Sequence, residues 1–350
     1  MAVSTIRRER SSMASGMAQV KHVSARIETH FGPVGRLRRG LPIAPSLHPG
    51  RLPPMPIAPS LDSFCRRILE RGDLASKLDP PGDMNPGLAS GSEAPRPAPS
   101  LSPSISPPPD QPARDPGLEM RGGAPALPRP GQLGDPALRA ICLARFAHHE
   151  LMAVELFAWA LLRWPDVPRG LQGGWLDALA DEQIHCRLYL GRLEKLGSRL
   201  EAHPQSDYFW KQVPGIAASP YGPRAFLAAL GLTLEQANLD FTGVYRDAFR
   251  AAGDEASAQV FERVYSDEIQ HVALAARWLN RLSPEHANDP VGAYEAAVPY
   301  PLAASRAKGR RFNADARRAA GLEDSFIDHV RTARSSQELA SAPRRPGEDP

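Results

Sequence analysis

The sequence predicts an all-α protein whose centre is a four-helix bundle with a long crossover between the second and third helices. Two Glu-x-x-His motifs lie in the region expected to form this bundle, and each follows a lone glutamate by 32 or 33 residues. The region is also poor in proline, since six of the 37 prolines lie between residues 141 and 280 and 23 precede residue 131. The first set is Glu150, Glu182 and His185, and the second is Glu235, Glu268 and His271.

The two sets have the composition of a dinuclear metal site. Residues at positions i and i+3 lie on one face of an α-helix, so each Glu-x-x-His motif presents both side chains to the same neighbour. A lone glutamate halfway along one helix and a motif halfway along its antiparallel partner are separated by roughly thirty residues. Four carboxylates and two imidazoles are the ligand set of dinuclear four-helix bundles. We therefore expect these six side chains to bind two iron ions, with manganese as the alternative.

Acidic residues next to the expected ligands repeat with them. Asp181 and Asp267 directly precede ligand glutamates, and such carboxylates usually accept a hydrogen bond from a metal-bound histidine. The alternative for both is an exposed acid beside the core face. Glu155 and Asp240 each follow a lone glutamate by five residues, about 140° round the helix. We expect them to support the ligands, or to replace the lone glutamates if the helical register differs.

The chain before the bundle divides into three parts. Residues 1–58 are predicted to be a disordered leader, or to contain a later start codon, because they are rich in arginine and serine and lack an apolar signal region. Residues 59–79 carry apolar positions at helical spacing after a Ser/Asp start, which predicts a short helical segment. Residues 80–133 are rich in proline and are expected to be an extended linker or a segment that wraps across the bundle.

The four bundle helices are expected within residues 134–283. Asp135 followed by Pro136 is typical of a helix start, and Pro165 should stop this first helix at Trp164. The other boundaries follow from glycines and prolines between periodic apolar stretches. The expected helices are 135–164, 171–196, 224–252 and 254–282.

Two segments lie outside these helices. Four prolines within residues 198–223 predict a long crossover between the two hairpins. Residues 284–350 are expected to form a C-terminal extension with a short helix near 322–334 and a disordered end. The extension also carries a basic stretch, made up of Arg306, Lys308, Arg310 and Arg311.

Composition excludes several classes of protein. Three cysteines at scattered spacing form neither a disulfide framework nor a thiolate metal site, which favours a reducing cytoplasm. No apolar run approaches the roughly 18 residues that span a bilayer, so no membrane partner is expected. The net charge is +3, and acids are mixed with the basic residues of the tail. This favours a solvated surface and leaves RNA as a weak candidate partner.

Aromatic side chains are candidates for a substrate channel. Tyr189 and Trp278 lie one and two helical turns beyond the ligand histidines, where they line a channel or pack in the core. Phe209 and Trp210 lie in the crossover, and loops carry substrate contacts that helices cannot adjust. The two histidines before Glu150 are further ligand candidates, with polar residues at the bundle edge as the alternative.

Several stretches resemble known families. Residues 146–160 (Phe-Ala-His-His-Glu-Leu-Met-Ala-Val-Glu-Leu-Phe-Ala-Trp-Ala) and 265–272 (Tyr-Ser-Asp-Glu-Ile-Gln-His-Val) are similar to an uncharacterised bacterial family, domain-of-unknown-function family 455. The tail at 306–313 shares this likeness, which covers roughly residues 60–80 and 120–330. The Asp-Glu-x-x-His signatures resemble the ferritin-like superfamily of ferritins, rubrerythrins, ribonucleotide reductase small subunits and di-iron monooxygenases, and the last of these most. The ferritin-like tRNA hydroxylase, which acts on a modified adenosine, is a more distant likeness.

These observations predict a di-metal oxidoreductase that activates dioxygen, as a hydroxylase or oxygenase of an unknown organic substrate with an unknown electron donor. A ferroxidase or iron-handling protein is the second hypothesis, although the long crossover and basic tail differ from the compact chain of cage-forming ferritins. A metal-stabilised scaffold without turnover is the third. A small homo-oligomer fits the first hypothesis, whereas a ferritin cage would have a very high mass.

Overall fold

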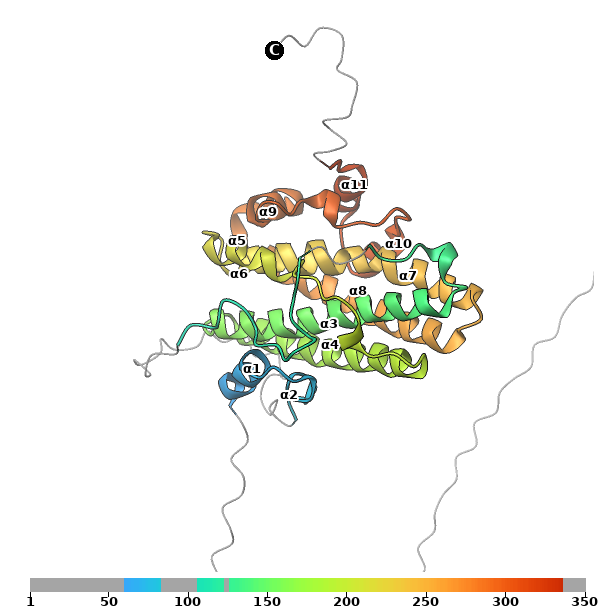
Figure 1. The fold of residues 1–350 in the computed structure, drawn as a ribbon. Coiled ribbons are helices and arrows are strands. Elements are labelled where there is room, and N and C mark those ends of the chain that lie inside the picture. The colour runs from blue at the N-terminus through green and yellow to red at the C-terminus, as the bar shows by residue number, and fades with distance from the viewer. Residues whose placement is uncertain (1–59, 83–105, 123–125, 336–350) are drawn as a thin grey trace, which may run out of the picture. The chain divides into compact units, whose positions relative to one another are not determined.

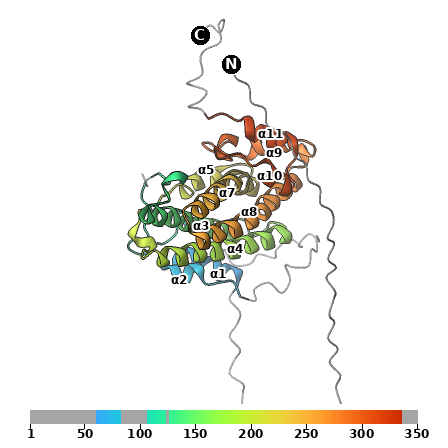
Figure 2. The ribbon, with the colours of Figure 1, turned by 90° about the vertical axis from the view of Figure 1, so that its right-hand side faces the viewer.

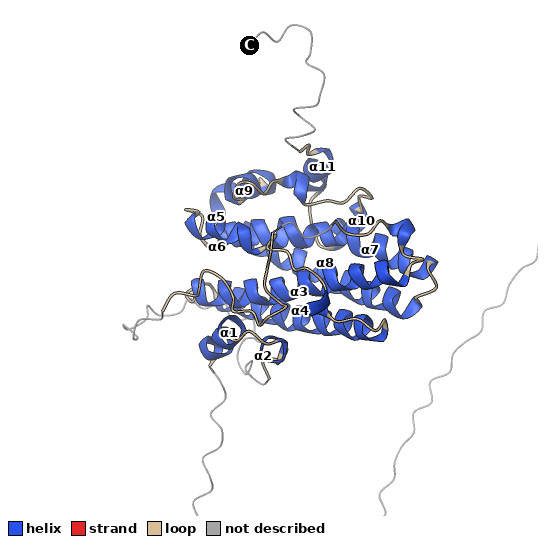
Figure 3. Cartoon of the chain, in the orientation of Figure 1, coloured by secondary structure: helices blue, strands red, loops and turns tan. Residues whose placement is uncertain are grey.

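The computed structural model describes residues 60–82, 106–122 and 126–335, and in these ranges every regular element is helical (Figure 3). An isolated β-bridge joins Met120 to Gln205. The all-α prediction is therefore confirmed for this part of the chain. The expected leader, the alternative start codons and the end of the C-terminal extension lie outside the described residues. None of the described helices combines the length and the apolar character needed to cross a membrane.

The first helical hairpin consists of α3 (Pro136–Arg163) and α4 (Arg169–Lys195). The side chain of Asp135 accepts a hydrogen bond from the backbone N–H of Ala137, and Pro136 is the first helical residue, as the sequence predicts. Most of α3 is buried because it packs against α4 on one side and against N-terminal segments on another. The two helices lie side by side through most of their length (Figure 1).

The second hairpin pairs a composite helix with α8 (Glu255–Leu282). The composite helix runs without a break through α6 (Pro223–Phe226), the π-helix η4 (Leu227–Glu235) and α7 (Gln236–Ala251). The sequence predicts one continuous α-helix here, and the π-helical hydrogen bonding is a departure from that prediction. All residues of η4 are buried, and α8 also packs against α4, which joins the two hairpins.

A glycine permits the close approach of η4 to α8. A Cβ atom added at Gly231 would lie 2.3 Å from the Cβ of Ala275, well inside van der Waals contact. Gly231 precedes Glu235 by about one helical turn, so this close approach fixes the position of the glutamate relative to α8.

The crossover between the hairpins contains three short helices. They are η2 (Leu200–Ala202), η3 (Trp210–Gln212) and α5 (Val213–Ala218). Phe209 and Trp210 are buried in the main apolar core, so the crossover is packed onto the helices along part of its length. A long connection is the expected outcome of joining two hairpins whose ends are apart.

The N-terminal described segment forms two helices where the sequence predicts one. These are α1 (Leu61–Glu70) and α2 (Leu74–Leu78), with Asp73 capping the second. The break at Gly72 allows residues 106–122 to pass close by, because the backbone N–H of Asp115 donates to the Gly72 carbonyl at 3.0 Å. A Cβ at Gly72 would lie 2.7 Å from that nitrogen. Both helices pack against the α3–α4 hairpin (Figure 2).

A buried ion cluster ties these N-terminal segments to α3. Glu155 is fully buried and lies 2.9 Å from the Lys77 amine and 2.7 Å from the Arg114 guanidinium. The indole N–H of Trp210 also donates to the Glu155 carboxylate at 2.9 Å. Three segments that are distant in sequence therefore meet at one carboxylate, which fixes them on the outer side of α3.

The C-terminal extension packs on the second hairpin through α9 (Pro290–Ala297) and α10 (Ala314–Ala319), and α11 (Asp324–Thr332) packs on α9 and α10. Only the last of these is close to the short helix expected from the sequence. Arg317 in α10 is fully buried and binds both carboxylate oxygens of Asp240, at 2.8 and 3.0 Å. Two backbone N–H groups, from Gly309 and Asn313, donate to the same carboxylate. A single acid on α7 thus anchors the part of the extension between Ala307 and Arg317.

We expect Arg317→Met to lower the free energy of unfolding of the metal-free protein by about 3–5 kcal/mol, because it leaves the Asp240 carboxylate buried without its cation. The matched control is Arg318→Met, since the neighbouring Arg318 is half exposed and pairs with surface acids. That substitution should cost about 1 kcal/mol or less. Urea denaturation followed by circular dichroism measures both, and equal losses in the two variants would contradict the anchoring role.

Candidate metal centre

Six acidic and histidine side chains converge at the middle of the four long helical segments. Each segment contributes: α3 supplies one carboxylate, η4 supplies one at its last residue, and α4 and α8 each supply a Glu-x-x-His pair. Every one of the six has at most 4% of its surface exposed. They are Glu150, Glu182, His185, Glu235, Glu268 and His271.

The donor atoms form two groups that share one glutamate. In the first group, atoms of Glu150, Glu182 and His185 all lie within 4.8 Å of one another. In the second, atoms of Glu182, Glu235 and His271 do the same. Glu182 therefore lies between the two groups, where its carboxylate can contact a cation on either side. Each group of three buried donors could hold a metal ion.

The two imidazoles have matching orientations. His185 Nδ1 lies 3.2 Å from one oxygen of Glu182, and His271 Nδ1 lies 3.1 Å from the other. On its far side, each ring meets the aspartate of the opposite motif. His185 Nε2 lies 2.9 Å from Asp267, and His271 Nε2 lies 3.4 Å from Asp181. With a cation at Nδ1, the Nε2 N–H would donate to these aspartates and fix the ring orientation, as sequence analysis expects of these two acids.

The sixth donor, Glu268, has a different partner. Its carboxylate accepts a hydrogen bond from the side-chain amide of Asn238 at 2.8 Å, and its other oxygen lies 3.7 Å from His271 Nδ1. Asn238 is not among the residues that sequence analysis selects. A mid-helix asparagine has no distinctive pattern, although its position three residues after Glu235 places it on the same helical face.

The protonation states of the centre are strongly coupled. Burial alone would raise the pKa of Glu182, but the charge and hydrogen bonds of His185 and His271 outweigh burial and hold this pKa below its usual value. Burial would lower the pKa of His185, but hydrogen bonds to Asp267 and Glu182 raise it to about 9. Burial raises the pKa of Glu150 well above its usual range. In the metal-free centre, several of these groups therefore hold protons, and a bound cation could displace those protons.

The four buried glutamates of the centre are suited to bind metal cations. Among the described residues, no lysine or arginine forms an ion pair with any of the four ligand glutamates. Single oxygens of Glu150, Glu235 and Glu268 are buried without a hydrogen bond. Ionised carboxylates in this position are very costly unless they are paired or bind a metal. The donor set, carboxylate oxygen with imidazole nitrogen, suits iron, manganese or zinc.

Glu155 and Asp240 lie away from the ligands. Their hydrogen bonds and ion pairs go to Lys77 and Arg114 in one case and to Arg317 in the other. The five-residue offset from the lone glutamates turns both side chains toward the outer face of their helices, where the flanking segments pack. They therefore anchor those segments, a role that differs from the expected support of the ligands.

The four aromatic side chains expected to line a channel lie in different surroundings. Tyr189 is fully buried and packs against Phe261 with ring centroids 5.1 Å apart. Trp278 is also buried, and the Arg281 guanidinium lies 5.1 Å from its ring. Trp210 is bound to the Glu155 anchor. Of the four, Phe209 lines a cavity beside the centre, and the structure places the other three in packing roles.

A cavity of about 350 Å³, the inner cavity, lies beside the centre. Phe209 and Tyr208 of the crossover form part of its wall, and His149 stacks on the Phe209 ring at 5.3 Å. His149 directly follows the buried His148 and precedes Glu150. Asn238, which binds the Glu268 carboxylate, forms another part of the wall. One hydrogen-bonded amide therefore separates this cavity from the ligand carboxylates.

Comparison with known proteins identifies a family. The family model described as "Protein of unknown function (DUF455)" matches residues 87–328, more than half of the chain. All six converging side chains lie within the matched residues. Neither the curated proteins nor the solved structures contain a match to the chain.

We expect the purified protein to bind about two transition-metal ions per chain, because the donors include two groups of three, each of which could hold one ion. Glu182→Gln should reduce the content to one ion or fewer, since Glu182 belongs to both donor groups. The matched control is Glu194→Gln, which changes an exposed glutamate of the same helix. Elemental analysis of the dialysed proteins measures the content. Full loading of the Glu182 variant would refute the assignment.

Metal affinity should rise with pH between about 6.5 and 9. The pKa of His185 in the metal-free protein is about 9, above its usual value of 6.5, so its ring carries a proton at neutral pH. A cation must displace that proton, and each displaced proton makes the affinity rise about tenfold per pH unit. Competition between the protein and a metal-binding dye for Co²⁺ at several pH values measures this slope. A flat profile would show that the imidazoles are not ligands.

Proposed function

The chain belongs to the DUF455 family, whose description assigns no activity, and we propose that it is a di-iron carboxylate oxidoreductase with a ferritin-like four-helix bundle. The observation that carries the proposal is the position of Glu182 between two imidazoles and two further buried carboxylates. Helical hairpins that bring together four glutamates and two Glu-x-x-His motifs are the framework of dinuclear carboxylate proteins.

Charge balance favours two ions over one. Four ionised glutamates carry four negative charges, which two divalent cations neutralise. With a single divalent ion, the other two glutamates would either keep protons or stay ionised at a cost of several kcal/mol each. Iron is the proposed metal and manganese the alternative, because mixed carboxylate and imidazole donors suit both.

Bound iron would supply the activation of dioxygen, chemistry that side chains alone do not perform. The chain's own residues have three tasks around it. The six donors would hold the ions, and Asp181 and Asp267 would keep the imidazoles oriented through Nε2. The apolar packing of α3 and η4 would exclude bulk water from the centre.

The inner cavity favours an oxygenase or hydroxylase over iron storage. An organic substrate needs a preformed apolar pocket near the ions, and 350 Å³ lies in the range of small-molecule sites. Oxidation of iron alone needs no such pocket. The residues of the crossover that form its wall, Tyr208 and Phe209, come from the connection that a minimal bundle would lack. A ferroxidase remains the second candidate, and a metal-stabilised scaffold without turnover the third.

The proposed working environment is the reducing cytoplasm. Cys65, Cys142 and Cys186 are all buried as free thiols, and burial raises the pKa of each. Such thiols serve as small apolar core residues and need no oxidising compartment. The proposed partners are dioxygen, an organic substrate and a separate electron donor, and the proposed assembly is a small homo-oligomer.

The oxygenase and storage proposals differ in how the protein handles excess iron. We expect anaerobic protein to take up about two Fe²⁺ per chain and to oxidise only this amount when oxygen is admitted. Additional Fe²⁺ should not be retained after gel filtration, because a small oligomer has no storage cavity. Optical spectra, oxygen consumption and light scattering give the three readouts.

Two outcomes would overturn the proposal. Retention of many iron ions per chain in a very large particle would favour storage. Absence of any oxygen consumption by fully loaded protein would favour the scaffold. Glu182→Gln serves as the negative control in both measurements because it removes the shared ligand.

A further inference from the structure

The basic stretch of the C-terminal extension lies beside the inner cavity, which its residues Arg306 and Lys308 line. The loop that contains it lies against α7, where the backbone N–H groups of Gly309 and Asn313 donate to Asp240. Arg317 holds the same carboxylate and also donates to the Ala307 carbonyl at 2.8 Å. The loop is therefore fixed at both ends by buried hydrogen bonds and keeps a defined position on the bundle.

A second cavity of about 1100 Å³, the outer recess, opens beside this loop. It shares four lining residues with the inner cavity, so the two spaces meet along one boundary. The shared residues are Leu127, Phe241, Ser305 and Lys308. The inner cavity reaches Asn238 next to the ligand carboxylates, and the outer recess reaches the surface of the extension.

The two spaces differ in chemistry. The rings of Phe146, Tyr208, Phe209 and Phe241 line the inner cavity, together with His149 and the cations Arg306 and Lys308. The outer recess is lined by the cationic side chains Arg129, Lys308, Arg310, Arg311 and Arg331. Its acids are Asp240 and Asp247. The outer recess thus carries more cationic side chains than the inner cavity, whose wall is mainly apolar.

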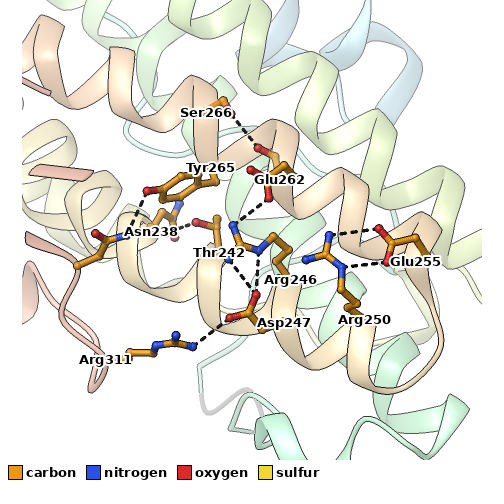
Figure 4. Close-up of polar contacts among 11 residues, drawn as sticks. Asn238, Thr242, Arg246, Asp247, Arg250, Glu255, Glu262, Tyr265, Ser266 and Arg311 are labelled. Atoms are coloured by element: carbon orange, nitrogen blue, oxygen red, sulfur yellow. Dashed lines mark hydrogen bonds and ion pairs between the residues drawn. The ribbon is translucent and has the colours of Figure 1, made fainter. Parts of the chain in front are cut away.

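Both acids of the outer recess are already neutralised. Asp240 is bound by Arg317, which lies outside the recess lining. Asp247 accepts from Arg246 at 2.9 Å and from Arg311 at 3.0 Å, and Figure 4 shows both guanidinium groups directed at its carboxylate. Arg129 and Arg310 are exposed and form no ion pair with any described residue. Their charge remains available for a ligand.

We infer that the substrate is a small amphipathic organic anion, whose phosphate or carboxylate group binds at Arg129 and Arg310 while its apolar part enters the inner cavity. Guanidinium groups match both anions with paired hydrogen bonds. Aromatic walls suit an apolar ring or chain, and Asn238 would face its buried end. This inference rests on the proposed function for the reaction, but the binding that it describes does not require a metal.

A small molecule fits better than a nucleic acid. The cations line a recess of limited size and border an apolar space, whereas a nucleic acid is bound by a basic stripe that follows its backbone. The net charge of the chain is only +3. An RNA ligand is therefore an alternative that the experiment must separate.

The test is isothermal titration calorimetry of the full chain, metal-free and metal-loaded, with 1-naphthyl phosphate as the probe. Two matched ligands divide the probe into its parts, inorganic phosphate for the anion and 1-naphthol for the apolar ring. We expect each part to bind at least about tenfold more weakly than the intact probe, because both contacts contribute. Raising the salt concentration should weaken binding of the phosphate ester.

Three variants locate the site. Arg310→Glu should weaken probe binding by at least about tenfold through lost attraction and new repulsion. Phe241→Ala should weaken binding of the probe while leaving inorganic phosphate unaffected, because Phe241 contributes an apolar wall to both spaces. The matched control is Arg277→Glu, an exposed arginine on α8 outside both linings, which should bind like the parent protein. Unchanged metal content and circular dichroism show that each variant is folded.

The remaining outcomes contradict the inference. Equal affinity for naphthol and naphthyl phosphate, or no effect of Arg310→Glu, would remove the anion site. Equal affinity for inorganic phosphate and for 1-naphthyl phosphate would show that the inner cavity does not bind the apolar part of the ligand. A single-stranded RNA that binds more tightly than the probe and displaces it would show that the ligand of this site is RNA and not a small molecule. Probe binding that persists in a protein without oxygen chemistry would refute the proposed function while retaining this site.

Discussion

Four glutamate side chains lie in the centre of this protein with at most 3% of their surface exposed, and the surrounding structure is arranged to compensate their charge. Moving a carboxylate from water into a protein core costs several kcal/mol unless protons, cations or hydrogen bonds offset it. In the metal-free state the two imidazoles and protonated carboxyl groups provide this offset. Bound cations would do so with all four glutamates ionised. Each long helical segment contributes a donor, so the packing of the helices and the balance of charge at the centre depend on each other.

Two further buried acids, Glu155 and Asp240, differ from the four central glutamates in how their charge is neutralised. Glu155 and Asp240 are as deeply buried as the ligands and occupy the same helices. Each is neutralised by cationic side chains of the chain itself, Lys77 and Arg114 for one and Arg317 for the other. The central glutamates have no such partner among the described residues. Burial alone therefore does not mark a candidate ligand, whereas burial without a lysine or arginine partner distinguishes the four central carboxylates from Glu155 and Asp240.

The sequence could predict those parts of the site that depend on local periodicity. The i, i+3 spacing of each motif and its repeat at 32 and 33 residues already select the side chains that converge in the structure. Long-range partners carry no such signal. Arg114 is 41 positions from Glu155, and Arg317 is 77 positions from Asp240. Nothing local distinguishes them from surface arginines. The π-helix also escaped prediction, because its apolar residues suit an α-helix equally well.

That π-helix affects how the centre is placed relative to the two cavities. It ends at Glu235, and the next two turns of helix place Asn238 against Glu268, Phe241 in the cavity wall and Asp240 beneath the basic loop. Successive residues of an α-helix differ in direction by about 100°, so a shift of one residue in the helical register would misplace all of these side chains together. The wider π-helical turn sets this register before the ligand. The stretch from Glu235, at the end of η4, to Phe241 in α7 thus joins a candidate metal ligand, the wall of the inner cavity and the anchor of the outer recess. Recognition of a substrate at the surface and chemistry at the centre would therefore depend on the same two helical turns.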